Sequence, residues 1–292
     1  MSTVASLTLA READQQRLHD QLRDFSRRRL RPVVAMEAPL APAEEARLRA
    51  LEEHFLQAEL AAVQATVATA PTTAGAFLDW FEALREQGPG QFDPLFDWLA
   101  EQAELPALRW FLSQELAGEA GFDDLAALTQ LGMPPAAKLE IARNYWDEMG
   151  RGRQSKMHGL LLQRVATHLR LPHVPTVWES LALANGMAGM ALNRHYAFHA
   201  VGALGAVELT APDRVERVHA AMRRLDLPRR VGHYHLLHAS LDRVHWRDWR
   251  DGVIAPLIEI YPQTMPRIAA GALVRLRAGA RCFARYRQQL EL

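Results

Sequence analysis

The chain has 292 residues, of which 49% are hydrophobic and 23% are charged, and its formal net charge is zero. This length allows one large domain or two smaller ones with a sizeable core, and the balanced charge argues against nucleic acid as a partner. The single cysteine, Cys282, excludes an internal disulfide bond and a thiolate metal cage.

The N-terminus and the longest apolar stretch both favour a cytoplasmic protein. The first apolar run is short, and Arg11, Glu12 and Asp14 follow it, which is unlike a secretory signal. Residues 181–209 form the longest apolar stretch, but asparagine, arginine, histidine and glutamate interrupt it. We therefore expect a buried helix there rather than a membrane span.

The composition predicts an all-α protein. Ala, Leu, Arg, Glu and Gln dominate, and β-branched runs with period-2 alternation are missing. Proline and glycine separate the expected helices, which cover residues 11–30, 43–68, 72–87, 92–101, 106–130, 135–149, 155–169, 176–209, 210–225, a segment after Pro228 and a last segment after Pro256. We expect residues 1–70 to form an N-terminal helical arm of unassigned function, and residues 71–292 to form one helical bundle.

The segment His238-Ala-Ser-Leu-Asp242-Arg-Val-His245 carries three side chains that can bind a metal. Each residue turns an α-helix by about 100°, so positions i, i+4 and i+7 lie on one face. Two imidazoles and a carboxylate therefore point the same way over two turns. Since a metal usually needs more than three ligands, the rest of the chain should supply others.

Three further carboxylates occupy positions where a negative charge is unfavourable unless a cation or a hydrogen-bond donor balances it. Glu115 lies in the stretch 110–137, whose only charged residues are acidic, and Glu119 follows one turn later. Glu148 is in the last turn of an expected helix, where a carboxylate opposes the helix dipole. Glu208 is near the end of the long apolar helix, where a carboxylate must be paired, protonated or bound to a cation. Singly, each also fits a solvated or ion-paired acid.

The glycines after Glu148 affect where the next histidine points. Asp147 and Glu148 share the last helical turn, and either the arginines that follow or a metal could balance their charge. His158 lies ten residues after Glu148, about 80° from its face on a straight helix. Gly150 and Gly152 allow the chain to bend or restart, so His158 can still join Glu148.

Four other histidines are interpreted as structural rather than as ligands: His195, His199, His233 and His235. On an ideal helix the first two point well away from Glu208, and His233 points about 140° away from His238. His235 is offset from His238 by about 60° and could support a ligand from behind.

The ordered combination of motifs resembles the haem-oxygenase-like diiron oxidases and oxygenases, often described as iron-containing redox enzymes. The motifs are Phe111-x-x-Gln114-Glu115, Asn144-Tyr-Trp-Asp-Glu148-x-Gly-x-Gly with His158, Gly-Ala-Leu-Gly-Ala-Val-Glu208 and His238-x-x-x-Asp242-x-x-His245. The resemblance covers roughly residues 75–255.

This resemblance implies a haem-oxygenase-like bundle of seven helices that holds two Fe(II) ions and no haem. Carried over residue by residue, it implies the ligand set Glu115, Glu148, His158, Glu208, His238, Asp242 and His245, with Glu119 as a substitute for Glu115. Imidazole and carboxylate ligands suit Fe(II), and helix bundles present them from inward-facing positions. Four carboxylates would neutralise two Fe(II) ions, which would allow the cluster to be buried.

We therefore predict an oxidoreductase that activates O2 at a non-haem diiron centre and oxidises a small organic substrate, as an oxygenase or an oxidase. No catalytic residue beyond the metal ligands is predicted. The expected partners are the substrate and O2, with no nucleic acid and no membrane. A homodimer fits the sequence as well as a monomer does.

Three alternatives stay open at this point. A metal-free relative with the same bundle would bind a small molecule or a cofactor precursor, but such relatives lack most of the ligand set. A helical interaction module fits the composition, yet it does not explain four ordered motifs. A haem protein needs only one axial histidine, which leaves the carboxylates unexplained.

Overall fold

The computed structural model describes residues 3–34, 38–119 and 121–292, and the side chains of residues 3–9 and 117–119 lie outside that description. Within these ranges the chain forms helices and connecting turns and no β-strand, which confirms the predicted all-α class. None of the helices in this part of the chain is both long enough and apolar enough to cross a membrane. The α-helices are α1 (Thr3–Leu30), α2 (Pro42–Ala61), α3 (Gln64–Val67), α4 (Ala74–Gln87), α5 (Pro94–Glu101), α6 (Leu105–Glu119), α7 (Phe122–Thr129), α8 (Pro135–Glu148), α9 (His158–Leu169), α10 (Trp178–Leu192), α11 (Ala197–Arg224), α12 (Arg229–Trp249), α13 (Ala255–Ile260) and α14 (Met265–Gln289).

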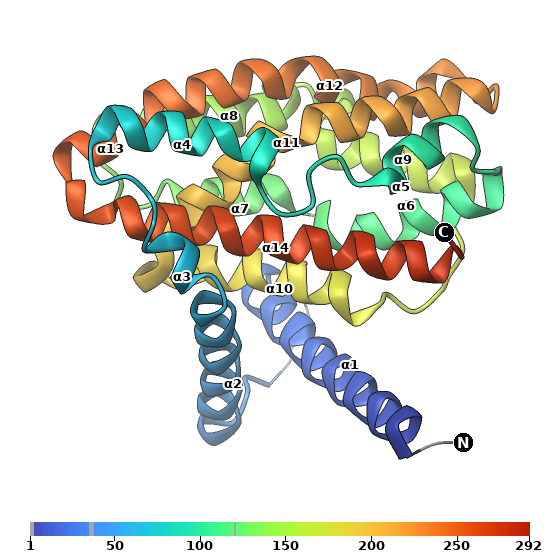
Figure 1. Ribbon diagram of the computed structural model, residues 1–292, viewed down its shortest axis with the longest axis horizontal. Helices are drawn as coiled ribbons and strands as arrows, with labels where there is room; N and C mark the ends of the chain where they lie inside the picture. Colours follow the sequence, from blue (N-terminus) through green and yellow to red (C-terminus); the bar gives the residue numbers. More distant parts are fainter. Residues whose placement is uncertain (1–2, 35–37, 120) are drawn as a thin grey trace.

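Helix α11 is the centre of the bundle. It packs against α12 along one side and against α14 along another, and it also contacts α5, α7 and α10 (Figure 1). Helices α8 and α9 both contact α12. Because α8, α9 and α11 all meet α12, polar side chains on their facing surfaces are brought into one interior region.

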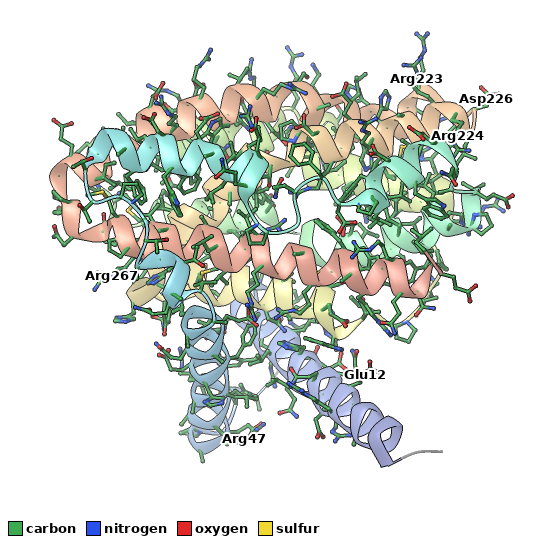
Figure 2. All side chains as sticks on the ribbon, viewed as in Figure 1. Glu12, Arg47, Arg223, Arg224, Asp226 and Arg267 are labelled. Atoms are coloured by element: carbon green, nitrogen blue, oxygen red, sulfur yellow. The ribbon has the colours of Figure 1, made fainter. Side chains whose placement is uncertain are left out.

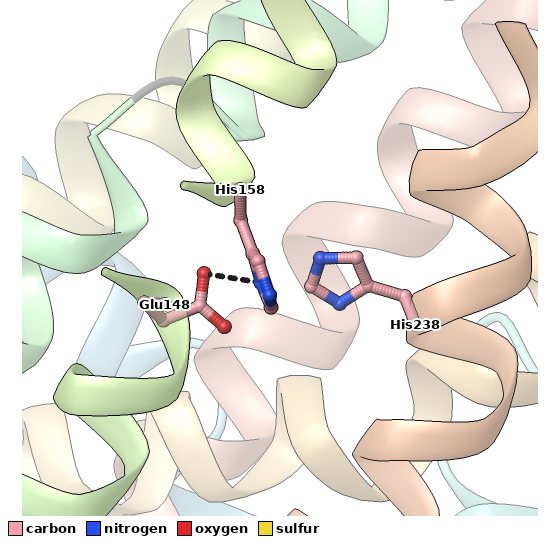
Figure 3. Close-up of side chains that lie close together, drawn as sticks. All are labelled: Glu148, His158 and His238. Atoms are coloured by element: carbon pink, nitrogen blue, oxygen red, sulfur yellow. Dashed lines mark ion pairs between the residues drawn. The ribbon is translucent and has the colours of Figure 1, made fainter. Parts of the chain in front are cut away.

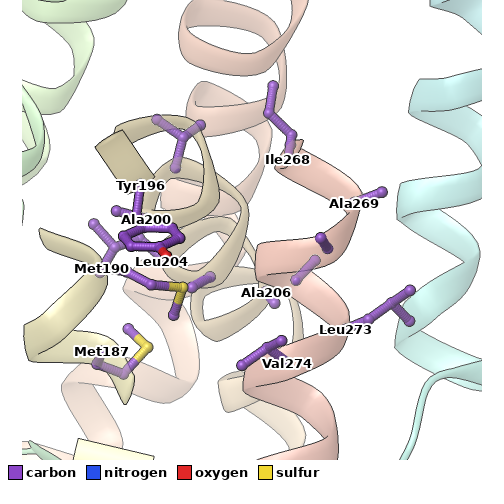
Figure 4. Close-up of a cluster of buried hydrophobic side chains, with 14 of the residues drawn as sticks. Met187, Met190, Tyr196, Ala200, Leu204, Ala206, Ile268, Ala269, Leu273 and Val274 are labelled. Atoms are coloured by element: carbon purple, nitrogen blue, oxygen red, sulfur yellow. The ribbon is translucent and has the colours of Figure 1, made fainter. Parts of the chain in front are cut away.

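Helices α11 and α14 approach so closely that only glycine fits at two positions. A Cβ atom on Gly202 would lie 1.9 Å from the carbonyl oxygen of Ile268, and a Cβ atom on Gly271 would lie 1.9 Å from the carbonyl oxygen of His199. Small and medium apolar side chains fill the surrounding interface, among them Leu204 (Figure 4). The two helix backbones are therefore in close contact where residues 199–202 cross residues 268–271, and this contact holds α11 against α14.

Helices α1 and α2 project from one side of the bundle (Figure 1). Helix α1 packs on α10, and Leu22, Phe55 and Leu56 join the bundle's hydrophobic core. Charged side chains such as Glu12 and Arg47 lie on the projecting part (Figure 2). The division of the chain at residue 70 stays a prediction.

The expected helices 176–209 and 210–225 are wrong in their boundaries. The chain breaks at Asn193, whose side chain accepts a hydrogen bond from the backbone N–H two residues later at 3.0 Å. Helix α11 then continues through Pro212. Pro212 cannot donate to the carbonyl of Glu208, but the buried apolar faces on both sides keep the helix continuous. Glu208 consequently lies inside a long helix rather than near a helix end.

Candidate metal centre

Helix α12 presents His238, Asp242 and His245 to the bundle interior, as the spacing predicts. Asp242 and His245 are buried, and the His238 side chain is only 12% exposed. The hydrogen-bonded atoms His238 Nδ1 and Asp242 Oδ1 lie 2.9 Å apart. The three side chains do not converge on a single point, however, because they contribute to two neighbouring groups of candidate ligands.

The first group, here called triad A, consists of Glu148, His158 and His238. One ligand atom from each residue lies within 4.8 Å of the others, and the three residues come from α8, α9 and α12. His158 Nδ1 lies 2.8 Å from Glu148 Oε2 (Figure 3). The His158 and His238 rings meet edge to face, with centroids 4.6 Å apart. Two imidazoles and one carboxylate therefore face a common point.

A left-handed turn between α8 and α9 makes triad A possible. Gly150, Arg151 and Gly152 all have positive φ, at 62°, 53° and 76°. A Cβ atom on Gly150 would lie 2.5 Å from the backbone carbon of Lys156, so glycine is required there. The turn restarts the helix at His158, which confirms that the glycines allow this histidine to face Glu148.

The second group, triad B, consists of Glu208, Asp242 and His245, all buried and also within 4.8 Å of one another. His245 Nδ1 lies 3.4 Å from Glu208 Oε2. The other oxygen of Glu208, Oε1, accepts a hydrogen bond from Asn144 Nδ2 at 2.7 Å. Asn144 therefore holds one oxygen of the carboxylate, while the other faces the triad.

Asp147 orients the His245 ring from the side opposite Glu208. His245 Nε2 and Asp147 Oδ2 lie 3.2 Å apart, so Nε2–H can donate to the carboxylate while Nδ1 faces triad B. Arg151 donates to Asp147 at 2.6 Å, so one of the two compensations that the sequence left open, an arginine, is present for Asp147. The contact with His245 was missed by the sequence analysis, because 98 residues separate the two side chains. A carboxylate behind a ligating histidine fixes its tautomer and raises its basicity.

Glu115 lies outside both triads. It lines a separate, mainly apolar cavity and forms a hydrogen bond with the Tyr286 hydroxyl. The side chain of Glu119, its expected substitute, lies outside the described residues. On α12, His233 is exposed, and His235 is buried against the same cavity as Glu115. The two triads therefore contain three carboxylates. Glu115, the fourth carboxylate that the resemblance implies, lines the other cavity instead.

The acids and imidazoles of the triads balance one another's charge. Burial raises the pKa of Asp242 to about 6, with a further contribution from the charge of Glu208. Burial opposes the charged form of His245, but the Glu208, Asp242 and Asp147 carboxylates outweigh it and raise the His245 pKa to about 9. Burial also opposes ionisation of Glu148, yet the neighbouring histidines lower its pKa overall. A bound cation would take over this charge balance from the protons.

The donor set fits iron. The buried Nδ1 atoms of His158 and His245 have no hydrogen-bond partner of acceptable geometry among the described residues, although each faces a carboxylate oxygen. Such nitrogens normally have a partner, and a metal ion would supply one. Two histidines with one carboxylate, as in triad A, are a recurrent set for non-haem Fe(II) with open coordination positions.

Both triads border one cavity of about 550 Å³. Glu148, His158 and His238 line it from triad A, and Glu208 and Asp242 line it from triad B. Asp123, Tyr234 and apolar side chains of α7, α9 and α11 line the rest of the wall. A small molecule in this cavity would therefore lie beside both triads.

A family model described as an iron-containing redox enzyme matches residues 109–280, which is more than half of the chain. The matched segment includes both triads, the turn between α8 and α9, and Glu115. No curated protein matches the chain significantly.

Proposed function

Because this chain belongs to the iron-containing redox enzyme family, we propose that it is a non-haem diiron oxidoreductase that activates O2 to oxidise a small organic molecule. The observation that carries the proposal is the pair of buried triads joined through α12 and bordering one cavity. A single metal would leave three of the six donors unused, whereas two metals use both triads.

Each residue of the site has a part in this proposal. Glu148, His158 and His238 would hold one iron, and Glu208, Asp242 and His245 would hold the other. Reduced iron supplies the electrons and the Lewis acidity for O2 chemistry. Asn144 and Asp147 keep Glu208 and His245 in position from outside the cluster. Three carboxylates against two Fe(II) ions leave one positive charge, and the nearby Asp147 carboxylate reduces its cost.

Iron stoichiometry tests the proposal. Purified protein is loaded with Fe(II) under anaerobic conditions, desalted and assayed for iron. We expect about two irons per chain, one for each triad. His238→Ala should lower the iron content, and His233→Ala, on the exposed face of the same helix, should leave it unchanged. Less than one iron per chain, with no difference between the two variants, would exclude a diiron centre.

The reaction itself is followed by O2 consumption. Fe(II)-loaded protein should consume O2 faster than the His238→Ala variant at equal protein concentration. Small organic acids, amines and alcohols are then added one at a time. Substrates are the compounds that accelerate O2 consumption. Consumption that is equal in the wild type and in His238→Ala would show that free iron, not the triads, reacts with O2.

A further inference from the structure

A second cavity, of about 770 Å³, lies beside the metal cavity, and no residue of either triad lines it. We propose that this cavity binds the substrate, and that the substrate is an apolar carboxylic acid whose carboxylate is received by Arg275. The proposal rests on the proposed function, because it concerns what the iron site oxidises. It also assigns Glu115 to this cavity instead of to iron.

The two cavities are neighbours that share part of their walls. Both are lined by Leu162, Val207, Ala211, Val215 and Tyr234. Val207 directly precedes Glu208 in α11, and the Tyr234 ring lies 4.5 Å from the His238 ring between centroids. A molecule in the second cavity therefore ends next to ligands of both triads.

Most of the second cavity is apolar. Aromatic and aliphatic side chains of α5, α6, α9, α11 and α14 surround it, including Phe96, Phe111, Val165 and Phe283. Apolar walls with a few polar groups are usual for sites that bind small organic molecules. The body of the ligand should accordingly be a hydrocarbon chain or an aromatic ring.

Among the side chains that the structure describes, three charged ones line the cavity: Glu115, Arg214 and Arg275. Two guanidinium groups against one carboxylate leave an excess of one positive charge. Arg214 donates to the Thr210 hydroxyl at 2.8 Å, and Glu115 is bonded to the hydroxyl of Tyr286.

Arg275 is the member of this set that can receive a ligand. It is half-buried, and it forms no hydrogen bond or ion pair with any residue that the structure describes. A guanidinium group carries five N–H donors in a planar fork that matches a carboxylate.

The histidine in the wall, His235, does not alter this charge balance. His235 is buried, and its burial lowers the pKa of the imidazole to about 3, so the ring is neutral near pH 7. An ammonium ligand would meet two guanidinium groups, and an uncharged ligand would leave Arg275 without a counter-charge. A carboxylate satisfies both the charge and the donor geometry.

Calorimetric titration of the purified full-length chain with decanoate, decanol and decylamine tests the ligand class. We expect decanoate to bind, decanol to bind at least tenfold more weakly, and decylamine not to bind. Arg275→Gln should weaken decanoate binding about ten- to hundredfold and leave decanol unaffected. The matched control is Arg277→Gln, an exposed arginine on the same helix, which should bind decanoate like the wild type.

Two outcomes would overturn the ligand assignment. One is decanoate binding no tighter than decanol or decylamine in the wild type, a comparison that needs no variant. The other is equal decanoate binding in Arg275→Gln and Arg277→Gln.

The iron content of each sample separates this proposal from the proposed function. If the protein binds decanoate but no iron, the cavity assignment is retained and the diiron function is excluded. If it binds iron but no decanoate, the diiron function is retained and the cavity assignment is excluded. Glu115→Gln removes the opposing carboxylate, so we expect tighter decanoate binding at unchanged iron content. A fall in iron content in Glu115→Gln would show instead that Glu115 is a metal ligand.

Discussion

Replacing Asp147 by asparagine should weaken metal binding at triad B and leave triad A intact. Asp147 Oδ2 lies 3.2 Å from Nε2 of His245. The Asp147 carboxylate therefore contacts the edge of the ring opposite to the one that faces triad B. Asparagine keeps the size of the side chain but removes its charge. The variant should fold, because the other contact it loses is an ion pair with Arg151, whose side chain is 71% exposed.

The size of the effect follows from the contact that is lost. A hydrogen bond to a charged group contributes about 1.5–3 kcal/mol, and about 1.4 kcal/mol corresponds to a tenfold change in affinity. We therefore expect a ten- to hundredfold weaker metal affinity, the range usual for carboxylates behind ligating histidines. Only one of the two metal-binding steps should change, since the Asp147 side chain bonds to Arg151 and to His245 of triad B and to no side chain of triad A among the described residues.

Anaerobic titration with Co(II), followed by visible absorption and by competition with a chelator, measures the two steps separately. Asp248→Asn is the matched control, because Asp248 is also on a helix of the site but pairs only with the exposed Arg247 among described residues. If Asp147→Asn bound both metal ions with wild-type affinity, or if Asp248→Asn weakened binding equally, the orienting role of Asp147 would be refuted.

Two further predictions concern stability. Burial lowers the pKa of His19 and His199 from 6.5 to about 4, so the folded state favours their neutral forms. The free energy of unfolding should therefore be highest above pH 6.5 and fall as the pH drops toward 4, by up to about 3 kcal/mol for each histidine. Urea unfolding at several pH values across this range measures the loss. Gly202→Ala should destabilise the fold by about 3 kcal/mol or more, because the added Cβ would lie 1.9 Å from a backbone oxygen. The control is Gly75→Ala, which has no atom within 4 Å of the added Cβ and should change stability by less than about 1 kcal/mol. Thermal unfolding compares the two variants, and equal melting temperatures would contradict the close approach of α11 and α14.

The sequence by itself determined the fold class and most of the candidate donors. Helix-forming composition without β-periodicity is a local property, so it predicts an all-α chain without tertiary information. The spacing of His238, Asp242 and His245 places them on one helix face for the same reason, because helix geometry alone sets their direction. Gly150 and Gly152 signalled the turn that brings His158 to Glu148, since positive φ is a local preference of glycine.

Only the tertiary structure decided how these donors are grouped. The packing of α8, α9 and α11 around α12 divides one helix face between two triads, and no spacing along the sequence encodes that division. The same packing turns Glu115 toward a neighbouring cavity and puts Asp147 behind His245. Which side chains meet depends on interhelical contacts between segments far apart in the chain, whereas the direction of each side chain on its own helix depends on the local sequence.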